Sequence, residues 1–299
     1  MTEATLPVGA ARRRDWRLAQ PAWLTPNRRR ALRDGLVLSG VLAAGLAGMM
    51  SYIGGVTGSG VGAVDAHAYW VNRPPVSYGP LAGTNDAFLY SPAFAQLLSP
   101  LTVLPWPVFL AAWLSGLLLA LRWLTGPWLL LPAVVLFFGE IAYGNVHCLL
   151  AAAMVVGFRH PWTWSLVLLT KITPAVGLVW FAARREWRSL AVALAASAFI
   201  AVLSFALEPN SWLAWLDLLG RSAAADAPTV LLPGPLWLRL VLAAVLVTWG
   251  ARTDRPWVVP VAAVVALPHG TIGLAMLAGV VPLIRGSRFT PPPRHRDRP

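Results

Sequence analysis

The sequence contains few charged residues. Only 12% of its 299 residues are charged, 57% are hydrophobic, and the mean hydropathy is +0.63. A soluble domain carries about 25% charged residues, so this chain has too few polar side chains to cover a water-soluble globule. The composition excludes a soluble enzyme, a disordered chain and an ordinary nucleic-acid-binding domain. We therefore expect a polytopic membrane protein.

Cysteine and lysine are each present once. A single cysteine, Cys148, excludes an intramolecular disulfide and a metal cluster held by thiolates. The only lysine, Lys171, stands inside an apolar segment, where an ionisable side chain is a candidate for a functional site. The histidines His67, His147 and His269 lie on three separate segments without the spacing of metal ligands. We predict neither a metal nor another cofactor.

Arginine supplies almost all of the net charge of +12. Eight arginines precede the first apolar run, and several follow the last one. Cations that flank apolar spans are the signal for the cytoplasmic side of a membrane, and they bind anionic lipid. The sequence thus predicts membrane lipids and no nucleic acid as partners. It also predicts cytoplasmic tails at 1–34 and 286–299 around a membrane domain at 35–285.

Nine apolar runs cross this predicted membrane domain. They are Gly35–Ile53, Trp106–Leu121, Trp128–Phe138, Val146–Phe158, Trp162–Phe181, Leu190–Leu207, Leu236–Trp249, Trp257–Leu267 and Thr271–Ile284. The first is interpreted as a retained signal anchor, because its basic leader is too long for a signal peptide.

The fifth run conflicts with the arginines, because Arg159 and Arg184 before and after it both belong inside. Either the run is a hairpin broken at Lys171–Pro174, or it is one kinked helix and another span is miscounted. The prediction is an all-α protein of about nine to ten membrane segments in the cell membrane.

The long first outer loop, residues 54–105, holds most of the polar candidates. Its last part, Ser91–Leu101, is apolar, bounded by prolines and too short to span a bilayer. We expect an interfacial or re-entrant helix there. A second amphipathic helix is predicted over Ser211–Leu219, with Asp217 facing out. Six tryptophans are interpreted as an interfacial aromatic belt: Trp106, Trp128, Trp162, Trp164, Trp237 and Trp257.

Three patches of this chain resemble the glycosyltransferases of GT-C architecture that use polyprenyl-phosphate sugars. They are most similar to glycosyltransferase family 87, the actinobacterial mannosyltransferase-like group. The first patch is Asp65-x-x-x-Tyr69 with Leu89-Tyr90-Ser91-Pro92-Ala93-Phe94-Ala95. The second is Gly144-Asn145-Val146-His147, in which Asn145 and His147 replace the usual Gln and Asn. The third is Leu169-Thr170-Lys171-Ile172-Thr173-Pro174, followed by Arg184-Arg185-Glu186-Trp187-Arg188.

The resemblance implies an integral-membrane glycosyltransferase. Such an enzyme would move a mannose-like sugar from a polyprenyl-phosphate donor to a cell-envelope lipid or glycan acceptor on the outer face, with inversion. The residues give this a physical basis, because the acceptor hydroxyl needs a base and the departing phosphate needs cations. Asp65 is the candidate base, since burial near the membrane surface raises the pKa of a carboxyl group. A solvated loop or helix-cap carboxylate is the alternative for Asp65.

Arg73 and Lys171 are the candidate ligands of the donor phosphate. For Arg73 the alternative is an ion pair with Asp65 or Asp86. For Lys171 it is a side chain that extends to the membrane surface, although burying an ionisable group in a membrane segment costs at least ~2.5 kcal/mol.

Five further residues are candidates for substrate binding. Asp86 contacts sugar hydroxyls or serves a turn. Tyr69 and Tyr90 stack on sugar rings. Asn145 and His147 contribute to a polar pocket, which Glu140 either completes or borders as a helix cap.

Two other functions stay open from the sequence. A transporter or lipid flippase would use Lys171 and the broken segment as its substrate path. A non-catalytic homologue would fit the replacements at Asn145 and His147.

Overall fold

The protein is built from helices in the computed structural model. The structure describes residues 63–79, 86–224, 234–268, 273–286 and 289–291, and no strand occurs in these ranges. This confirms the predicted all-α class. The predicted first span Gly35–Ile53, the tail 1–34 and most of the tail 286–299 lie outside the described residues.

Thirteen α-helices and three 3₁₀-helices make up the described part of the chain. They are α2 (Val64–Val71), α3 (Pro92–Thr102), α4 (Trp106–Thr125), α5 (Pro127–Leu136), α6 (Phe138–Tyr143), α7 (His147–Gly157), η1 (Pro161–Thr163), α8 (Trp164–Thr170), η2 (Thr173–Leu178), α9 (Val179–Ala183), α10 (Trp187–Leu207), α11 (Pro209–Ala224), α12 (Leu236–Arg252), α13 (Val258–Val265), η3 (Leu274–Gly279) and α14 (Val280–Arg285).

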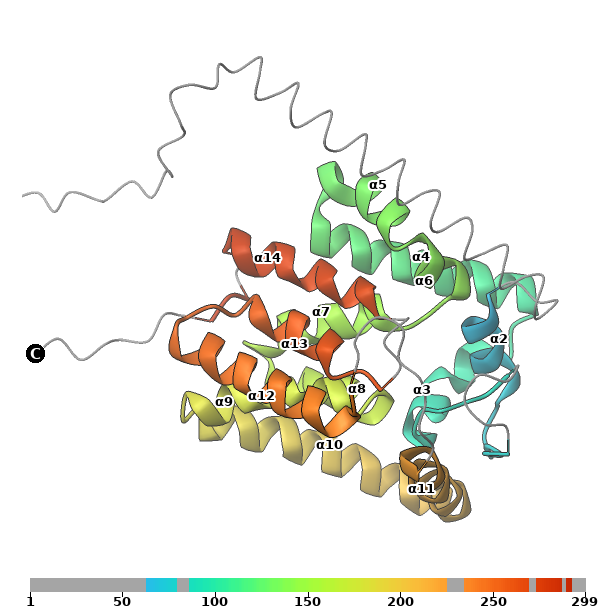
Figure 1. Ribbon diagram of the computed structural model, residues 1–299. Coiled ribbons are helices and arrows are strands. Elements are labelled where there is room, and N and C mark those ends of the chain that lie inside the picture. Colours follow the sequence, from blue (N-terminus) through green and yellow to red (C-terminus); the bar gives the residue numbers. More distant parts are fainter. Residues whose placement is uncertain (1–62, 80–85, 225–233, 269–272, 287–288, 292–299) are drawn as a thin grey trace, which may run out of the picture.

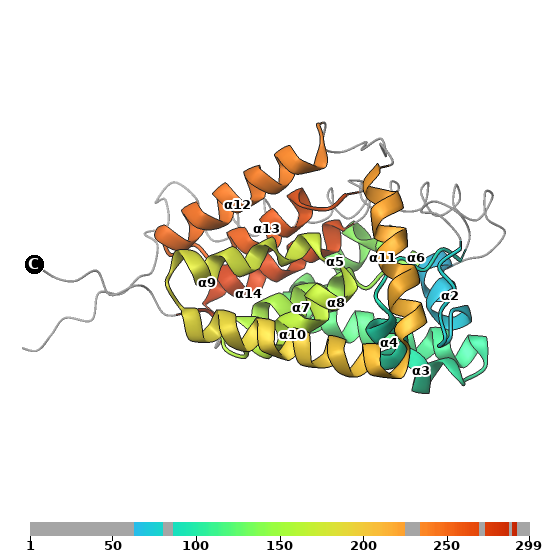
Figure 2. The same ribbon diagram turned by 90° about the horizontal axis from the view of Figure 1, so that it is seen from below.

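The long helices α4, α10 and α12 run between two ends of the molecule (Figures 1 and 2). One end, on the right in both views, carries α2, α3 and α11, and we call it the Asp65 end. The other, the arginine end, gathers the loops that follow α4, α7, α9, α12 and α14. There Arg285 donates to the Thr125 carbonyl over 3.1 Å. Arg184 pairs with Glu186 over 2.6 Å and with Asp254 across the α12–α13 turn.

The segment between Arg159 and Arg184 forms a hairpin. Its two arms are α8 and η2–α9, and they meet at Lys171, whose extended backbone (φ −134°, ψ 108°) separates them. Pro174, which cannot donate a backbone hydrogen bond, lies in the first turn of η2. Both arginines therefore reach the arginine end, while Lys171 reaches the Asp65 end. Of the two interpretations of this run, the structure has the hairpin.

Two of the described helices are long and apolar enough to cross a bilayer. They are α4, with 20 residues, and α10, with 21. The outward face of α10 is unusually apolar for a surface, since Phe199 is 70% exposed and Val202 is 68% exposed. Exposing such an apolar face to water costs free energy, whereas exposing it to lipid does not. These features support a membrane protein; the count of nine to ten spans stays a prediction.

Both short amphipathic helices predicted from the sequence are present at the Asp65 end. The first is α3, which begins with Pro92 in a first-turn position that suits proline. The second is α11, which buries Trp212, Trp215 and Leu218 and leaves Asp217 exposed. Trp215 Nε1 donates to the Leu89 carbonyl over 3.3 Å, so α11 packs against the chain that leads into α3.

The belt prediction was wrong for Trp164. This side chain is fully buried between two glycines, and a Cβ at Gly157 or Gly177 would come within 2.4 or 2.3 Å of its ring. The glycines make the space that the indole fills, and this pairing across the sequence is not visible in hydropathy. Trp128, by contrast, is 91% exposed, as a belt residue would be.

Candidate functional site

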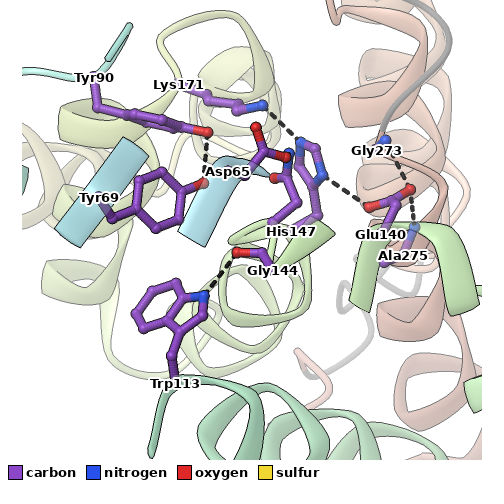
Figure 3. Close-up of polar contacts among 11 residues, drawn as sticks. Asp65, Tyr69, Tyr90, Trp113, Glu140, Gly144, His147, Lys171, Gly273 and Ala275 are labelled. Atoms are coloured by element: carbon purple, nitrogen blue, oxygen red, sulfur yellow. Dashed lines mark hydrogen bonds and ion pairs between the residues drawn. The ribbon is translucent and has the colours of Figure 1, made fainter. Parts of the chain in front are cut away.

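Six of the eight candidate residues come together at the Asp65 end (Figure 3). They arrive from four separate segments of the chain. Asp65 and Tyr69 lie on α2, and Tyr90 precedes α3. Asn145 and His147 stand at the start of α7, and Lys171 occupies the break between α8 and η2.

Gly144 allows α2 to approach the start of α7. Its backbone is left-handed (φ +74°), and a Cβ there would lie 2.5 Å from the Ala66 Cβ. Trp113 fixes the turn by donating to the Gly144 carbonyl over 2.7 Å. As a result Asn145 Nδ2 reaches Asp65 Oδ2 at 2.7 Å. The close packing of Gly144 against Ala66 thus brings the Asn145 side-chain amide within hydrogen-bond distance of the Asp65 carboxylate.

Replacing Gly144 should separate these two groups. We expect Gly144→Ala to lower the free energy of unfolding by about 2–4 kcal/mol, because it adds both a strained φ and a clash with α2. Activity should fall as well, since Asp65 lies one residue before Ala66. Thermal unfolding in detergent and a turnover assay measure the two effects.

Gly116→Ala is the matched control for that variant. A Cβ at Gly116 meets nothing within 4 Å, and the residue lies inside α4. Alanine favours a helix interior over glycine, so the melting temperature should stay or rise slightly. Equal melting temperatures for the Gly144→Ala variant and the unaltered protein would contradict the assigned role of Gly144.

Asp65 has the electrostatic setting of a base. Burial raises the pKa of its carboxyl group, and the nearby Glu140 carboxylate raises it further. The Lys171 ammonium group and the hydrogen bond from Asn145 act in the opposite direction, but burial dominates. Asp65 as a whole residue is neither fully buried nor exposed. A carboxylate with a raised pKa binds a proton more strongly, as proton abstraction from a hydroxyl requires.

Lys171 faces the same centre. Its Nζ lies 2.9 Å from His147 Nε2 and 5.6 Å from the centre of the Tyr90 ring. The Tyr90 hydroxyl is 2.8 Å from the Tyr69 hydroxyl. Burial raises the pKa of both phenols, so they are neutral. The cation is therefore held by a ring face and an imidazole nitrogen.

Tyr69 and Tyr90 form a wall of the cluster. Both are buried, and Tyr69 makes edge-to-face contacts with Phe88, Phe94 and Trp113. This packing fixes the phenols around the polar groups.

The other two candidates lie apart from the cluster. Asp86 accepts a hydrogen bond from His67 Nδ1 over 2.6 Å and has a left-handed backbone (φ 59°). Arg73 is exposed, and its guanidinium group lies 5.6 Å from the centre of the Trp70 ring. Asp86 thus pairs with a histidine, and Arg73 stacks on an indole.

Glu140 belongs to the cluster, although the sequence analysis left open whether it completes the polar pocket or only borders it as a helix cap. Its Oε2 lies 2.8 Å from His147 Nδ1. Its Oε1 accepts hydrogen bonds from the backbone N–H groups of Gly273 and Ala275 at 2.8 and 3.0 Å. The one signal in the sequence was a carboxylate within an apolar stretch. Within the described ranges, no three His, Cys, Asp or Glu side chains gather as metal ligands would.

Comparison with known proteins gives one match. The model of Glycosyltransferase family 87 matches residues 88–289, about two thirds of the chain. No curated protein and no solved structure matches. The matched span contains Asn145, His147 and Lys171 and begins after Asp65.

Proposed function

We propose a reaction on the premise that the chain belongs to glycosyltransferase family 87 and is a glycosyltransferase. In this reaction a mannose-like sugar passes from a polyprenyl-phosphate donor to a hydroxyl group of a cell-envelope lipid or glycan. The acceptor oxygen attacks the anomeric carbon, and the bond from that carbon to the phosphate oxygen breaks. The hydroxyl proton passes to Asp65, and polyprenyl phosphate leaves. Attack opposite the leaving group inverts the anomeric configuration.

The observation that carries this proposal is a base and a cation within one cluster. Asn145 holds one oxygen of the Asp65 carboxylate, which leaves the other oxygen for the acceptor proton. The Lys171 ammonium group has three N–H donors, of which one is directed at His147. Two donors remain for phosphate oxygens, where negative charge develops as the leaving group departs.

A shallow, open apolar groove that begins at Ile172, the residue after Lys171, supports a place for the lipid part of such a donor. It has a volume of about 430 Å³ and lies between η2 and α12. Its lining residues are Ile172, Thr173, Val176, Leu240, Val241 and Ala244. A second groove shares Val241 and Ala244 with it and continues to Arg252. From residue 240 to residue 252 the groove follows α12 for about 18 Å, at 1.5 Å per helical residue.

Filling this groove should weaken binding of long-chain donors. We expect Ala244→Trp to raise KM for a long polyprenyl-phosphate sugar by roughly tenfold, as lost burial of about two methylene groups would do. KM for a short-chain donor should stay within twofold. Val202→Trp, on the exposed face of α10, is the control. Equal changes for both chain lengths would contradict the assignment of the groove.

The distribution of charge supports an outer-face reaction. The cluster lies at the opposite end of the molecule from the ends of α9, α12 and α14 (Figures 1 and 2), where Arg184, Arg252 and Arg285 stand. Loops rich in arginine stay on the cytoplasmic side. The Asp65 end then faces outward, with both chain termini inside.

The test is sugar transfer by the purified protein in lipid nanodiscs. We expect labelled mannose to move from polyprenyl-phosphate mannose to an envelope lipid extract, with the opposite anomeric configuration in the product. Retained configuration, or no transfer from any polyprenyl-phosphate sugar, would refute the reaction. Movement of intact donor lipid across proteoliposomes without transfer would indicate a flippase, and donor binding without turnover a non-catalytic homologue.

A further inference from the structure

A chain of hydrogen bonds connects the Glu140 carboxylate to Lys171 through His147 (Figure 3). His147 Nδ1 lies 2.8 Å from Glu140 Oε2, and His147 Nε2 lies 2.9 Å from Lys171 Nζ. The other Glu140 oxygen accepts the N–H groups of Gly273 and Ala275. We call the three side chains the Glu140–His147–Lys171 chain.

The partners of His147 determine where its proton lies. An ionised carboxylate only accepts hydrogen bonds, so Nδ1 must carry a hydrogen to donate to Glu140. An ammonium group only donates, so Nε2 must present a lone pair to Lys171. The neutral Nδ1–H tautomer is the form that satisfies both contacts. His147 is fully buried, so water does not replace either partner.

Glu140 is fixed more firmly than an isolated carboxylate would be. Three donors hold it, and two of them are backbone N–H groups at the start of η3. Its side chain is only 11% exposed. Hydrogen bonds to an ionised acceptor are about twice as strong as those between neutral groups. The negative charge of Glu140 therefore stays at one place, 2.8 Å from the imidazole.

The ammonium group is directed at His147, although the Asp65 carboxylate is near enough for Lys171 to lower its pKa. Among the ion pairs of the residues that the structure describes, none joins Lys171 to Asp65. The Glu140 charge acts on Lys171 through the imidazole, so the ammonium group is directed at His147. Asp65 keeps its carboxylate for the acceptor, and Lys171 keeps two N–H groups for the donor.

We propose that Glu140 is a positioning residue that holds His147 in the Nδ1–H tautomer, so that His147 directs the Lys171 ammonium group toward the donor phosphate. The proposal rests on the proposed function, because that function supplies the phosphate. It also assigns a role to the histidine that replaces the usual Asn at position 147. An Asn side chain has no pair of ring nitrogens with which to contact Glu140 and Lys171 at once.

The Glu140→Gln variant tests this chain. A glutamine has one accepting oxygen, which the N–H groups of Gly273 and Ala275 attract. Its NH₂ group then faces His147 Nδ1 as a donor. If His147 keeps its Nδ1 hydrogen, that hydrogen faces the NH₂ group, and if His147 takes the Nε2–H form, the hydrogen faces the Lys171 ammonium group. Two donors now face each other, and Lys171 loses its direction.

Nitrogen-15 NMR of histidine-labelled protein reads the tautomer directly. The chain has five histidines, and His147→Gln identifies the signals of His147. We expect the Nδ1–H tautomer alone in the unaltered protein and a mixture of the Nδ1–H and Nε2–H tautomers in the Glu140→Gln variant. This measurement uses no substrate, so it stands even if polyprenyl-phosphate sugars prove not to be donors.

Kinetics read the consequence for the donor. In the Glu140→Gln variant we expect kcat/KM for polyprenyl-phosphate mannose to fall about tenfold to a hundredfold, as loss of one hydrogen bond to a charged group would cause. KM for the acceptor should not change, whereas general loosening of the fold would raise both. Glu208→Gln is the matched control, because Glu208 is a carboxylate of the Asp65 end that contacts Ser211.

Specific results would overturn the proposal. An Nε2–H or doubly protonated His147 in the unaltered protein would do so without any variant. Retention of the Nδ1–H tautomer alone in the Glu140→Gln variant, or equal loss for donor and acceptor, would do so as well. Failure of the proposed function looks different, because then even the unaltered protein transfers no sugar while the tautomer result remains.

Discussion

Asp65→Asn should lower kcat by roughly 10²- to 10⁴-fold, the usual contribution of a general base. An amide has the shape of a carboxyl group but does not take up the acceptor proton. Asn145 can still donate to the amide oxygen at position 65, so the contact between α2 and α7 survives. Steady-state transfer of labelled sugar measures the loss, and donor binding should remain.

Asp217→Asn is the control for this experiment. Asp217 is an exposed carboxylate on α11 that pairs with Arg221 over 2.9 Å. Its removal should leave kcat within twofold, since an exposed ion pair contributes little. The base assignment fails if the Asp65→Asn variant melts normally and turns over at more than about a tenth of the normal rate.

The pH dependence of turnover reports the same group. Burial raises the pKa of Asp65, so protonation begins at a higher pH than for an ordinary aspartate. The base works only when ionised. kcat/KM should therefore fall as the pH drops through this raised pKa and level off above it. The acidic limb should be absent from the residual activity of the Asp65→Asn variant.

Lys171→Gln should cause the second-largest loss, roughly 10²- to 10³-fold in kcat/KM for the donor, as expected when a donor to developing negative charge is removed. KM for the donor should rise, because the donor phosphate loses its cation. The ammonium group also lowers the pKa of Asp65. Without it that pKa rises, so the acidic limb of the rate profile should move to higher pH.

Arg221→Gln is the comparison for the lysine variant. Arg221 lies at the same end of the molecule, where it contacts Asp217 and the Tyr78 carbonyl. Removing this cation should shift neither the donor KM nor the acidic limb. A Lys171→Gln variant with normal donor KM and an unmoved pH profile would show that Lys171 serves another purpose.

Many residues of the site could be predicted from the sequence, because they are polar or charged residues in mostly apolar stretches. A lone lysine in an apolar run and a proline three residues later predicted the polar centre and offered the hairpin at Lys171 as one of two interpretations, which the structure then decided. A carboxylate soon after the first predicted span supplied the candidate base. The resemblance at Asn145 and His147 supplied the third segment, and the structure brings all of them together (Figure 3).

The remainder depended on contacts between distant segments. Glu140 and Gly273 are 133 residues apart in the sequence, so no local sequence pattern predicts the hydrogen bond between them. Trp164 is a tryptophan near the end of an apolar run, as a belt residue would be, but it is buried because two glycines on other helices leave space for its ring. Arg73 has the right charge, but it stacks on Trp70. Side-chain chemistry identifies candidates, and packing decides which of them meet.

The hydrogen bonds from Gly273 and Ala275 to Glu140 have a consequence for biosynthesis. These two donors stand at the start of η3, which is followed only by α14 among the described helices, whereas Asp65 is made more than 200 residues earlier. A nascent chain still attached to the ribosome before residue 273 therefore holds Glu140 with only one of its three donors. The centre is completed at the end of translation, so a protein truncated after α13 would enter the membrane with an unfinished centre.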